Sequence, residues 1–203
     1  MRVYALLLAA GESARMGQPK ALLPWQGGTL LEFQVEQLLA GGIERVILVL
    51  GHEAERIRRA VSALPRTTIV VNPEYATGKT SSVRAGMDAI PADTDAVLVV
   101  SVDQPRPAAL TRRLCQAHET AGAFITVPAF GGHHGHPTIF ARALFPEMRE
   151  ITEETQGLRA VRHRHRVETH VLQTAIRAPL IDINTPEDYQ AALAFFASLG
   201  VEP

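Results

Sequence analysis

Hydrophobic residues along this chain fall into short continuous runs, separated by longer stretches of helical periodicity. The runs have the length of buried strands and cover residues 3–10, 45–51, 67–72, 95–103, 123–130 and 169–174. Between most of them, apolar positions recur at the spacing of amphipathic helices, over residues 30–42, 52–64, 81–90, 107–122, 141–151 and 186–200. Runs such as "VILVL" are apolar on both faces, which favours a mostly parallel sheet covered by helices on both sides. The pattern therefore predicts an α/β fold, a single doubly wound, Rossmann-like domain over residues 1–203.

The composition gives no sign of a polyanionic or membrane partner. The net charge is -1 and the pI is about 6.7, so anion binding has to come from a local arrangement of residues. A run of about 18 apolar residues is absent, and the N-terminal residues do not resemble a secretion signal. We therefore expect a cytoplasmic protein without nucleic-acid or membrane partners. Cys115 is the only cysteine and lies in a helical pattern, so we expect a core thiol rather than a nucleophile.

The segment "LAAGESARMGQPK" at residues 8–20 follows the first predicted strand and carries the first candidate chemistry. In doubly wound sheets, ligands bind at the carboxyl ends of the strands, where this segment begins. Gly11 lets backbone N–H groups approach a phosphate, and Arg15 and Lys20 supply positive charge. The spacing fits neither a P-loop nor a G-x-G-x-x-G motif. A turn with solvated charges is the alternative interpretation of each residue.

The same thirteen residues resemble the signature L-A-[AG]-G-x-S-x-R-M-G-x-x-K of the MobA-like nucleotidyltransferases, the family of the molybdenum-cofactor cytidylyl- and guanylyltransferases. The resemblance implies the nucleotide-diphospho-sugar transferase-like form of the fold. It also implies transfer of a nucleotidyl group from an NTP with release of pyrophosphate. By position, Arg15 and Lys20 would contact the phosphates, and the nucleotide would be lined by Leu8, Ala9, Ala10 and Gly11.

Two further segments resemble the cytidylyltransferase branch of that family and imply CTP as the nucleotide. They are "VLGHEAERI" at 49–57, which places His52 at the nucleotide, and "NPEYATGKTSSVRAGM" at 72–87. A physical hypothesis agrees, because the methyl group of Ala10 favours a small pyrimidine and the hydroxyls of Ser81 and Ser82 can bond the edge of cytosine. As an alternative or additional role, "TSS" at 80–82 is the N-cap of the following helix.

Asp103 is the predicted metal ligand, because it ends a buried strand and is followed two residues later by proline. The family carries an Asp-x-Pro at this position that binds Mg²⁺, a cation that prefers carboxylate and phosphate oxygens; Mn²⁺ is the alternative. The segment "LIDINTPEDY" at 180–189 resembles the closing element of the family. It implies Asp182 as the second ligand, with Asn184 as the alternative, and Thr185 as a helix N-cap.

The acceptor side of the site is implied by two segments. "GGHHGHPTIF" at 131–140 resembles a loop that faces the pterin substrate, and "ETQGLRAVRHRH" at 154–165 resembles the G-x-R segment that follows it. The implied acceptor contacts are His136, Pro137 and Arg159. The histidines could instead bind zinc, although no fixed scaffold is evident. "RHRHR" at 162–166 is interpreted as a solvated basic face. The alternative is a substrate-phosphate contact, although on a strand the odd-even alternation would send its residues to opposite sides.

The leading prediction is an enzyme that transfers CMP from CTP to the phosphate of a molybdopterin-type cofactor, for a molybdenum hydroxylase that receives the product. Arg15, Lys20 and Asp103 are the predicted catalytic residues. The acceptor phosphate attacks the α-phosphorus directly, so no protein nucleophile is required. The alternatives are a nucleotidyltransferase with another NTP or a phosphorylated sugar or polyol acceptor, and a binding module that holds the cofactor for a partner.

Overall fold

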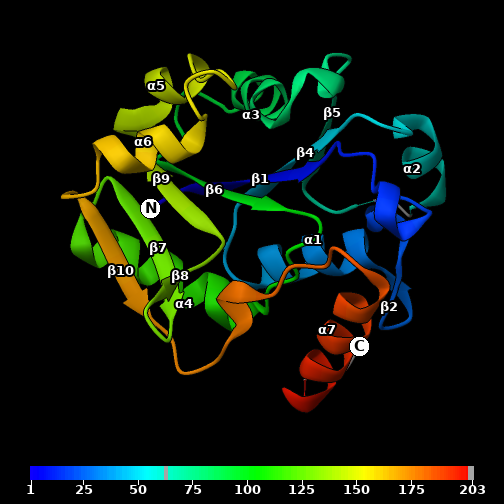
Figure 1. Ribbon diagram of the computed structural model, residues 1–203. Helices are drawn as coiled ribbons and strands as arrows, with labels where there is room; N and C mark the ends of the chain where they lie inside the picture. The colour runs from blue at the N-terminus through cyan, green and yellow to red at the C-terminus, as the bar shows by residue number, and fades with distance from the viewer. Residues whose placement is uncertain (62–63, 201–203) are drawn as a thin grey trace.

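The computed structural model describes residues 1–61 and 64–200, in which one twisted sheet runs through the molecule and helices cover both of its faces (Figure 1). Across the sheet, the strands follow the order β10 (Thr169–Gln173), β7 (Ile125–Phe130), β9 (Thr138–Ala141), β6 (Ala96–Ser101), β1 (Val3–Ala9), β4 (Arg45–Leu50) and β5 (Thr67–Val71). The short strand β8 (His133–His134) pairs with β7, and β2 (Pro24–Trp25) and β3 (Gly28–Thr29) form a separate hairpin.

The strand pairings confirm the predicted fold class. Strands β6, β1, β4 and β5 pair in parallel, as do β10 and β7, and six of the strands are the predicted ones. The antiparallel pairs of this sheet are β9 with β6, β9 with β7, and β7 with β8. The sequence did not predict β9, because its four residues directly follow the glycine- and histidine-rich loop without a distinct period.

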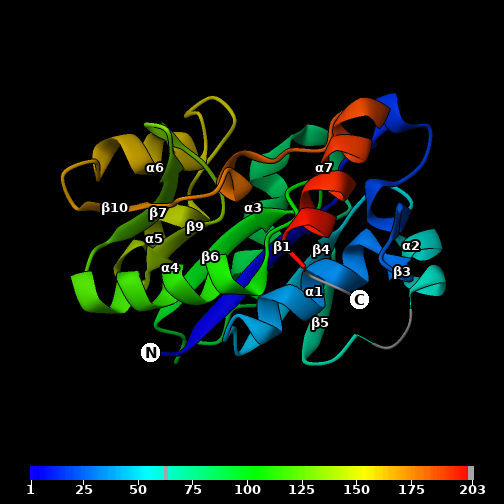
Figure 2. The same cartoon turned by 90° about the horizontal axis from the view of Figure 1, so that it is seen from below.

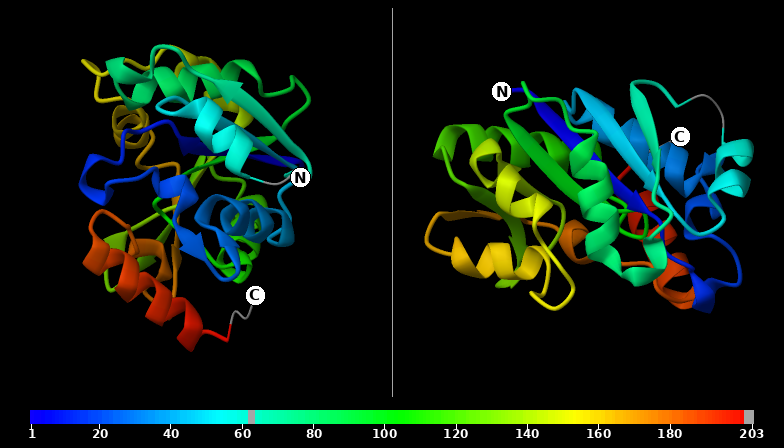
Figure 3. Two further views of the ribbon diagram at one scale, coloured as in Figure 1. Left: turned by 90° about the vertical axis from the view of Figure 1, so that its right-hand side faces the viewer. Right: turned by 90° about the horizontal axis from the view of Figure 1, so that it is seen from above.

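Each residue of β1 contributes to one of two cores, because alternate side chains of a strand point to opposite faces. Ala5 and Leu7 pack with α1 (Leu30–Ala40) and α4 (Ala108–Ala121), the two helices in front of the sheet in Figure 2. Leu6 and Leu8 pack on the other face with α3 (Lys79–Asp88), α5 (Phe145–Arg149) and α6 (Leu158–Arg164). The right panel of Figure 3 shows helices on this face of the sheet. Strand β1 is therefore enclosed on both sides.

The last helix, α7 (Pro186–Ser198), is attached through a third core of aromatic side chains. The rings of Trp25, Phe33 and Phe196 lie 5.4–5.5 Å apart, mostly in edge-to-face arrangements that favour aromatic pairs. As predicted, Thr185 is the N-cap of α7. Its side chain accepts a hydrogen bond from the Asp188 backbone, and the Asp188 carboxylate accepts one from Thr185 N–H, which forms a capping box.

Two predicted local structures differ from the observed ones. Helix α3 begins at Lys79 after Gly78, which makes no side-chain cap, so residues 80–82 lie inside the helix and the N-cap interpretation is wrong. The hydroxyl of Ser81 bonds the Gly78 carbonyl oxygen at 2.8 Å instead. Residues 158–164 form α6, so the basic segment that follows Val161 begins at the end of a helix. The helix predicted over 141–151 is a 3₁₀ turn at 142–144 followed by α5.

Helix α2 (Ala54–Ala60) covers the first part of the helix predicted over 52–64, a range that includes residues 62–63 outside the described chain. The chain after α2 returns to β5 at one edge of the sheet. Within the part of the chain that the structure describes, no helix is long and apolar enough to cross a membrane.

Candidate active site

The carboxyl ends of β1 and β6 open onto a cavity of about 300 Å³, which we name the β1 cavity. Ligands bind in this position in doubly wound sheets because the loops after the strands converge there. The wall includes Leu8, Ala9, Ala10, Gly11, Lys20, Tyr75, Lys79, Ser82, Ser101 and Asp103. The structure therefore gathers most of the residues that the sequence assigned to a nucleotide site, whereas Arg15, His52 and Ser81 do not line this cavity.

Lys20 joins two of the predicted metal-site segments. Its ammonium donates hydrogen bonds to Asp103 Oδ2 at 2.9 Å and to Asn184 Oδ1 at 3.1 Å. The hydroxyl of Ser13 accepts a hydrogen bond from Lys20 N–H at 3.0 Å, and the Asp103 carbonyl accepts one from Ile183 N–H at 2.8 Å. A carboxylate and an amide oxygen thus converge on one cation, and they are ligands of the kind that Mg²⁺ and Mn²⁺ prefer.

Asp182, the first predicted partner of Asp103, points to a different cation. Its Oδ1 lies 3.6 Å from Arg106 Nη2. Burial raises the pKa of Asp182; Arg106 opposes this rise, and the neighbouring Asp103 carboxylate adds to it. Both candidate second ligands therefore lie near Asp103, and of the two, Asn184 shares the Lys20 ammonium with it as a hydrogen-bond donor.

Arg106 is 1% exposed and fixes the loops that carry these side chains. Its guanidinium donates to the carbonyl oxygens of His136 at 2.8 Å, Pro105 at 2.8 Å, Ile181 at 2.6 Å and Pro179 at 3.0 Å. Burial lowers the pKa of Arg106 to about 10, which leaves it charged at neutral pH. One buried cation therefore connects the segment after β6, the loop before β9 and the segment before α7.

Ala10 and Tyr75 meet over Gly51 at one end of the β1 cavity. A Cβ atom at Gly51 would lie 2.5 Å from Tyr75 Cβ and 2.9 Å from Ala10 Cβ, so glycine is required for this close packing. His52 supports the same wall from outside the cavity. Its N–H donates to the Ala10 carbonyl oxygen at 3.1 Å, and its Nδ1 lies 3.4 Å from the Tyr75 hydroxyl.

The two predicted base-binding serines have different surroundings. Asn72 is buried, and its Nδ2 donates to the hydroxyls of Ser81 at 2.9 Å and Ser82 at 3.0 Å. The Ser81 hydroxyl also bonds backbone carbonyls and lies outside the cavity wall, whereas Ser82 lines the cavity. Of the pair, only Ser82 is therefore placed to contact a ligand there.

Arg15 lies outside the cavity, on an exposed turn over residues 14–16. Its charge acts on Asp188 at the start of α7. Backbone N–H groups of Asn184 and Thr185 lower the pKa of Asp188, and Arg15 adds to this effect. In this structure, the predicted phosphate contact therefore lies outside the β1 cavity, close enough to α7 for its charge to act on Asp188.

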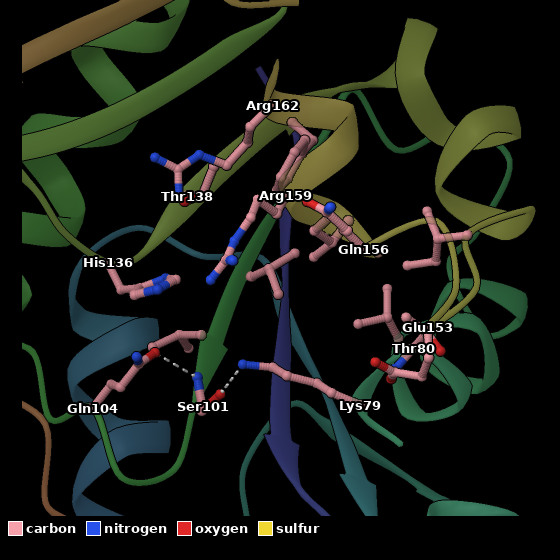
Figure 4. A pocket seen from close by; sticks show the side chains of 17 residues that line it. Lys79, Thr80, Ser101, Gln104, His136, Thr138, Glu153, Gln156, Arg159 and Arg162 are labelled. Atoms are coloured by element: carbon pink, nitrogen blue, oxygen red, sulfur yellow. Dashed lines mark hydrogen bonds between the residues drawn. The ribbon is translucent and has the colours of Figure 1, made fainter. Parts of the chain in front are cut away.

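A second cavity of about 450 Å³ lies next to the first, and we name it the α6 cavity (Figure 4). Apolar side chains that include Val83, Val99 and Phe140 form part of its wall. Its polar residues are Lys79, Thr80, Ser101, Gln104, His136, Thr138, Glu153, Gln156, Arg159 and Arg162. Lys79 and Ser101 line both cavities, which are therefore contiguous at this pair.

The α6 cavity has a strongly cationic wall. Arg159 and Arg162, one helical turn apart, point into it, and His136 lies across from Arg159 (Figure 4). Among residues 1–61 and 64–200, neither arginine forms an ion pair; burial lowers the pKa of Arg162, and Arg159 adds to the effect. Burial, with the charges of Lys79, Arg106 and Arg162, lowers the pKa of His136 to about 4. A neutral histidine beside two unpaired arginines is suited to an anionic ligand.

The remaining residues singled out by the sequence lie elsewhere. Pro137 is buried next to His136 but does not line the α6 cavity. His133 and His134 are exposed on β8, and among the described residues no three His, Cys, Asp or Glu side chains are arranged to hold a metal ion. As predicted, Cys115 packs against the core, where burial raises the pKa of its thiol to about 11.

Sequence reasoning missed the residues that connect the two cavities. Lys79 and Gln104 lie inside the motifs at 72–87 and 101–105, directly beside residues that were selected. Arg162 was interpreted as part of a solvated basic face, with a substrate-phosphate contact as the alternative, and it lines the α6 cavity. The position of Lys79 in a predicted nucleotide motif was a usable signal. No local pattern marks Arg106, because three of its four carbonyl partners are 30, 73 and 75 residues away in the chain.

The doubly wound sheet and the two cavities beside the carboxyl ends of its strands form the arrangement in which α/β proteins bind their ligands. The MobA-like NTP transferase domain model matches residues 5–169, and the chain belongs to this family. The predicted family and fold are thereby confirmed, and the chain is a member of a nucleotidyltransferase family.

Several known proteins resemble this chain over most of its length. The molybdenum cofactor cytidylyltransferase of Escherichia coli (strain K12) is 28% identical over 190 residues, which cover 94% of this chain and 95% of that protein. The nicotine blue oxidoreductase of Paenarthrobacter nicotinovorans is 35% identical over 166 residues, or 77% and 79% of the two chains.

The fold also resembles solved structures. The crystal structure of Rv0371c from Mycobacterium tuberculosis H37Rv has a TM-score of 0.80 at 28% identity, and the match covers 96% of this chain and 98% of that one. Rv0371c in complex with manganese has a TM-score of 0.74 at 24% identity, with 96% and 99% covered.

Proposed function

We propose that this protein transfers CMP from CTP to the phosphate of a molybdopterin-type cofactor and releases pyrophosphate. The observation that carries the proposal is the contact of the two cavities at Lys79 and Ser101, where two phosphorylated ligands could meet. The similarity to a molybdenum cofactor cytidylyltransferase supports both the nucleotide and the acceptor.

The β1 cavity would hold CTP. The chain at 8–11 would surround the nucleotide, with Ala10 restricting the space for the base and the Ser82 hydroxyl available to bond its edge. Lys20 would bind the departing pyrophosphate. Arg15, which lies outside this cavity in the structure, would reach the same phosphates through a movement of its exposed loop.

Asp103 and Asn184 would hold the divalent cation. The oxygens of both already converge on the Lys20 ammonium, and the manganese complex of Rv0371c supports a divalent metal in a protein of the same fold. When bound, Mg²⁺ or Mn²⁺ would offset the repulsion between the two phosphorylated substrates and stabilise charge in the transition state. Lys20 would then leave these oxygens for the phosphates.

The α6 cavity would hold the acceptor. Its apolar wall, which includes Val83 and Phe140, suits a flat ring system, and His136, uncharged at neutral pH, can both donate and accept hydrogen bonds there. Arg159 and Arg162 would bind an anionic group of the acceptor. The volume of about 450 Å³ lies within the range of sites for small molecules.

The chemistry needs no protein nucleophile. An ionised phosphate oxygen of the acceptor would attack the α-phosphorus in line, and the bond to the leaving pyrophosphate would break. The protein would contribute position and charge, with Lys20 on the leaving side. The raised pKa of Cys115 and its place against the core agree with the absence of a covalent intermediate.

Pyrophosphate release tests this proposal. Purified protein with Mg²⁺ and each of the four NTPs should release pyrophosphate only when CTP and molybdenum cofactor are both present. Release with another NTP would refute the cytidylyl assignment, and release with a sugar or polyol phosphate would identify another acceptor. No release with any pair would favour a module that binds the cofactor without reaction.

A second candidate function is the reduction or oxidation of an aromatic compound. The specific observation is the relative named nicotine blue oxidoreductase, which is 35% identical over 77% of this chain. Incubation with nicotine blue and NADH or NADPH tests this candidate, because consumption of the reduced nucleotide can be followed by absorbance. The cytidylyltransferase proposal predicts no consumption above the rate without protein.

A further inference from the structure

Lysine is rare in this chain, and both of its lysines line the β1 cavity. Of the 20 lysine and arginine residues, only Lys20 and Lys79 are lysines. The first lies in the loop after β1 and the second in the first turn of α3, yet both line the β1 cavity. A sequence that uses arginine at its other cationic positions therefore has its ammonium groups at the proposed active site.

Lys79 lies on the boundary between the two cavities. Its ammonium donates a hydrogen bond to Ser101 Oγ at 2.9 Å, and both residues belong to the walls of both cavities (Figure 4). The side chain is exposed to these cavities, and it forms no ion pair within residues 1–61 and 64–200. Its ammonium is therefore available to a ligand on either side.

The position of Lys79 does not favour the stability of α3. It is the first residue of the helix, where the backbone dipole favours negative charge and disfavours a cation. The first turn of α3 is instead stabilised by the Glu153 carboxylate, which accepts a hydrogen bond from Thr80 N–H at 2.8 Å. A lysine at this position is explained better by a ligand than by the helix.

The charge of Lys79 reaches the proposed acceptor site. It contributes to the lowered pKa of His136 in the α6 cavity, after burial.

We propose that Lys79 is a catalytic residue that binds the acceptor phosphate and holds it against the α-phosphate of the nucleotide. This inference rests on the proposed function, in which two phosphorylated substrates occupy the two cavities. A lone pair on the acceptor phosphate oxygen forms the new bond to the α-phosphorus. The bond from that phosphorus to the bridging oxygen breaks, and its electron pair leaves with pyrophosphate. Lys20 serves the leaving side, and Lys79 serves the attacking side.

The choice of lysine agrees with this role. An ammonium is a compact point charge with three donors on a flexible stem, so it can bridge oxygens of two phosphates that approach each other. A guanidinium is planar and larger, and it would hold one phosphate in a fixed fork. We therefore expect Lys79→Arg to recover only part of the activity lost in Lys79→Met.

Kinetics of variants are the first test. Lys79→Met should lower kcat about 100-fold, the usual effect of removing one donor to a developing charge, with little change in the KM for CTP. The matched control is Arg84→Met, which removes another cation from α3 near Glu154 without touching either cavity. The inference fails if kcat of Lys79→Met stays within about twofold of kcat of Arg84→Met.

Labelling of the two lysines is the second test, and it does not depend on turnover. Wild-type protein is acetylated by an N-hydroxysuccinimide ester, and the modified peptides are quantified by mass spectrometry. CTP with Mg²⁺ should slow the labelling of Lys20, and inorganic phosphate added to CTP should slow the labelling of Lys79 several-fold further. Unchanged labelling of Lys79 under the second condition would contradict a phosphate contact.

The two tests separate failure of this inference from failure of the proposed function. If phosphate protects Lys79 but no pyrophosphate appears with molybdenum cofactor, the lysine site stands and the proposed acceptor is wrong. If the cofactor and CTP react but Lys79→Met matches Arg84→Met, the proposed function stands and Lys79 is not catalytic.

Discussion

Arg106 has its guanidinium in the protein interior, where four backbone carbonyl groups from three segments accept its hydrogen bonds. A buried charge of this kind is costly to desolvate and is tolerated only when its donors are satisfied. The carbonyls belong to the segments that carry Asp103, His136 and Asn184. At the scale of single residues, the site is therefore held by a buried cation as well as by the residues that would touch substrate.

Replacement of Arg106 tests this positioning role. Arg106→Met should lower the free energy of unfolding by about 3–5 kcal/mol, because the carbonyl groups would lose their charged donor while they stay buried. Urea denaturation measures the change. The exposed Arg113 on α4 provides the control, and Arg113→Met should change stability by less than about 0.5 kcal/mol. Equal stability of the two variants would contradict the role of Arg106.

We expect the protein to lose stability in acid because of two histidines, His118 and His136. Burial lowers the pKa values of His118 and His136 to about 4, from an unfolded value of about 6.5. The unfolded chain therefore binds more protons between pH 6.5 and 4, and the free energy of unfolding falls as pH decreases through this range. Each histidine contributes at most about 1.4 kcal/mol per pH unit.

Comparison with His118→Gln isolates one of these contributions. His118 contacts the Thr126 hydroxyl at 2.8 Å in the core, away from both cavities. Urea denaturation at pH 6.5, 5.5 and 4.5 should show a shallower loss of stability for the variant than for the wild type. Parallel curves for the two proteins would show that His118 does not titrate on unfolding.

Ala10 is predicted to favour cytosine over guanine as the base of the nucleotide. Its methyl group lines the β1 cavity and packs near Tyr75, so Ala10→Gly would enlarge the space next to the proposed base position. We expect the ratio of kcat/KM for GTP to that for CTP to rise about tenfold, the lower end of discrimination by one methyl-sized group. An unchanged ratio in competition between the two nucleotides would remove Ala10 from base selection.

At the scale of elements, helix α3 depends on a close approach to the sheet. Gly86 faces β1 and β4, and a Cβ atom there would lie 2.0 Å from Leu6 Cδ1 and 2.8 Å from Val49 Cγ2. This approach brings the first turn of α3, with Lys79 and Ser82, to the carboxyl end of β1. The packing of one glycine thus determines where the two proposed ligand contacts lie.

A double-mutant cycle tests this packing. Gly86→Ala should lower the free energy of unfolding by about 1–3 kcal/mol, because the added methyl group overpacks the core. Leu6→Val shortens the side chain that the methyl group would meet, so the double variant should be less destabilised than the sum of the single changes. Urea denaturation of all four proteins gives the coupling, and strict additivity would contradict the proposed contact.

The elements with strong hydrophobic periodicity were predictable from the sequence, and the connections between them were not. The strands at 45–50 and 96–101 are continuous apolar runs, and Thr185 with Asp188 is a recognisable cap. Strand β9 and helix α6 are short, and their stability comes from neighbours that lie far away in the chain. The strand-end residues of the candidate site were therefore selected, whereas Arg162 and Lys79, whose importance depends on packing between elements, were not.

At the scale of the whole molecule, the doubly wound sheet delivers two adjacent cavities to one edge. The loops after β1 and β6 form the first, and α6 with the chain around His136 forms the second. Figure 1 shows α6 and α3 on the same side of the sheet, so both helices contribute to the region where the cavities join. This arrangement suits a reaction that joins two substrates more than the binding of one ligand.

The most direct test of CMP transfer follows the phosphorus atoms of CTP. Purified protein is incubated with Mg²⁺, molybdenum cofactor and CTP that is labelled with ³²P at either the α- or the γ-position. For CMP transfer, the α-label should appear in the cofactor product and the γ-label in pyrophosphate. Transfer of the γ-label to the cofactor, or retention of both labels in CTP, would contradict CMP transfer by this protein.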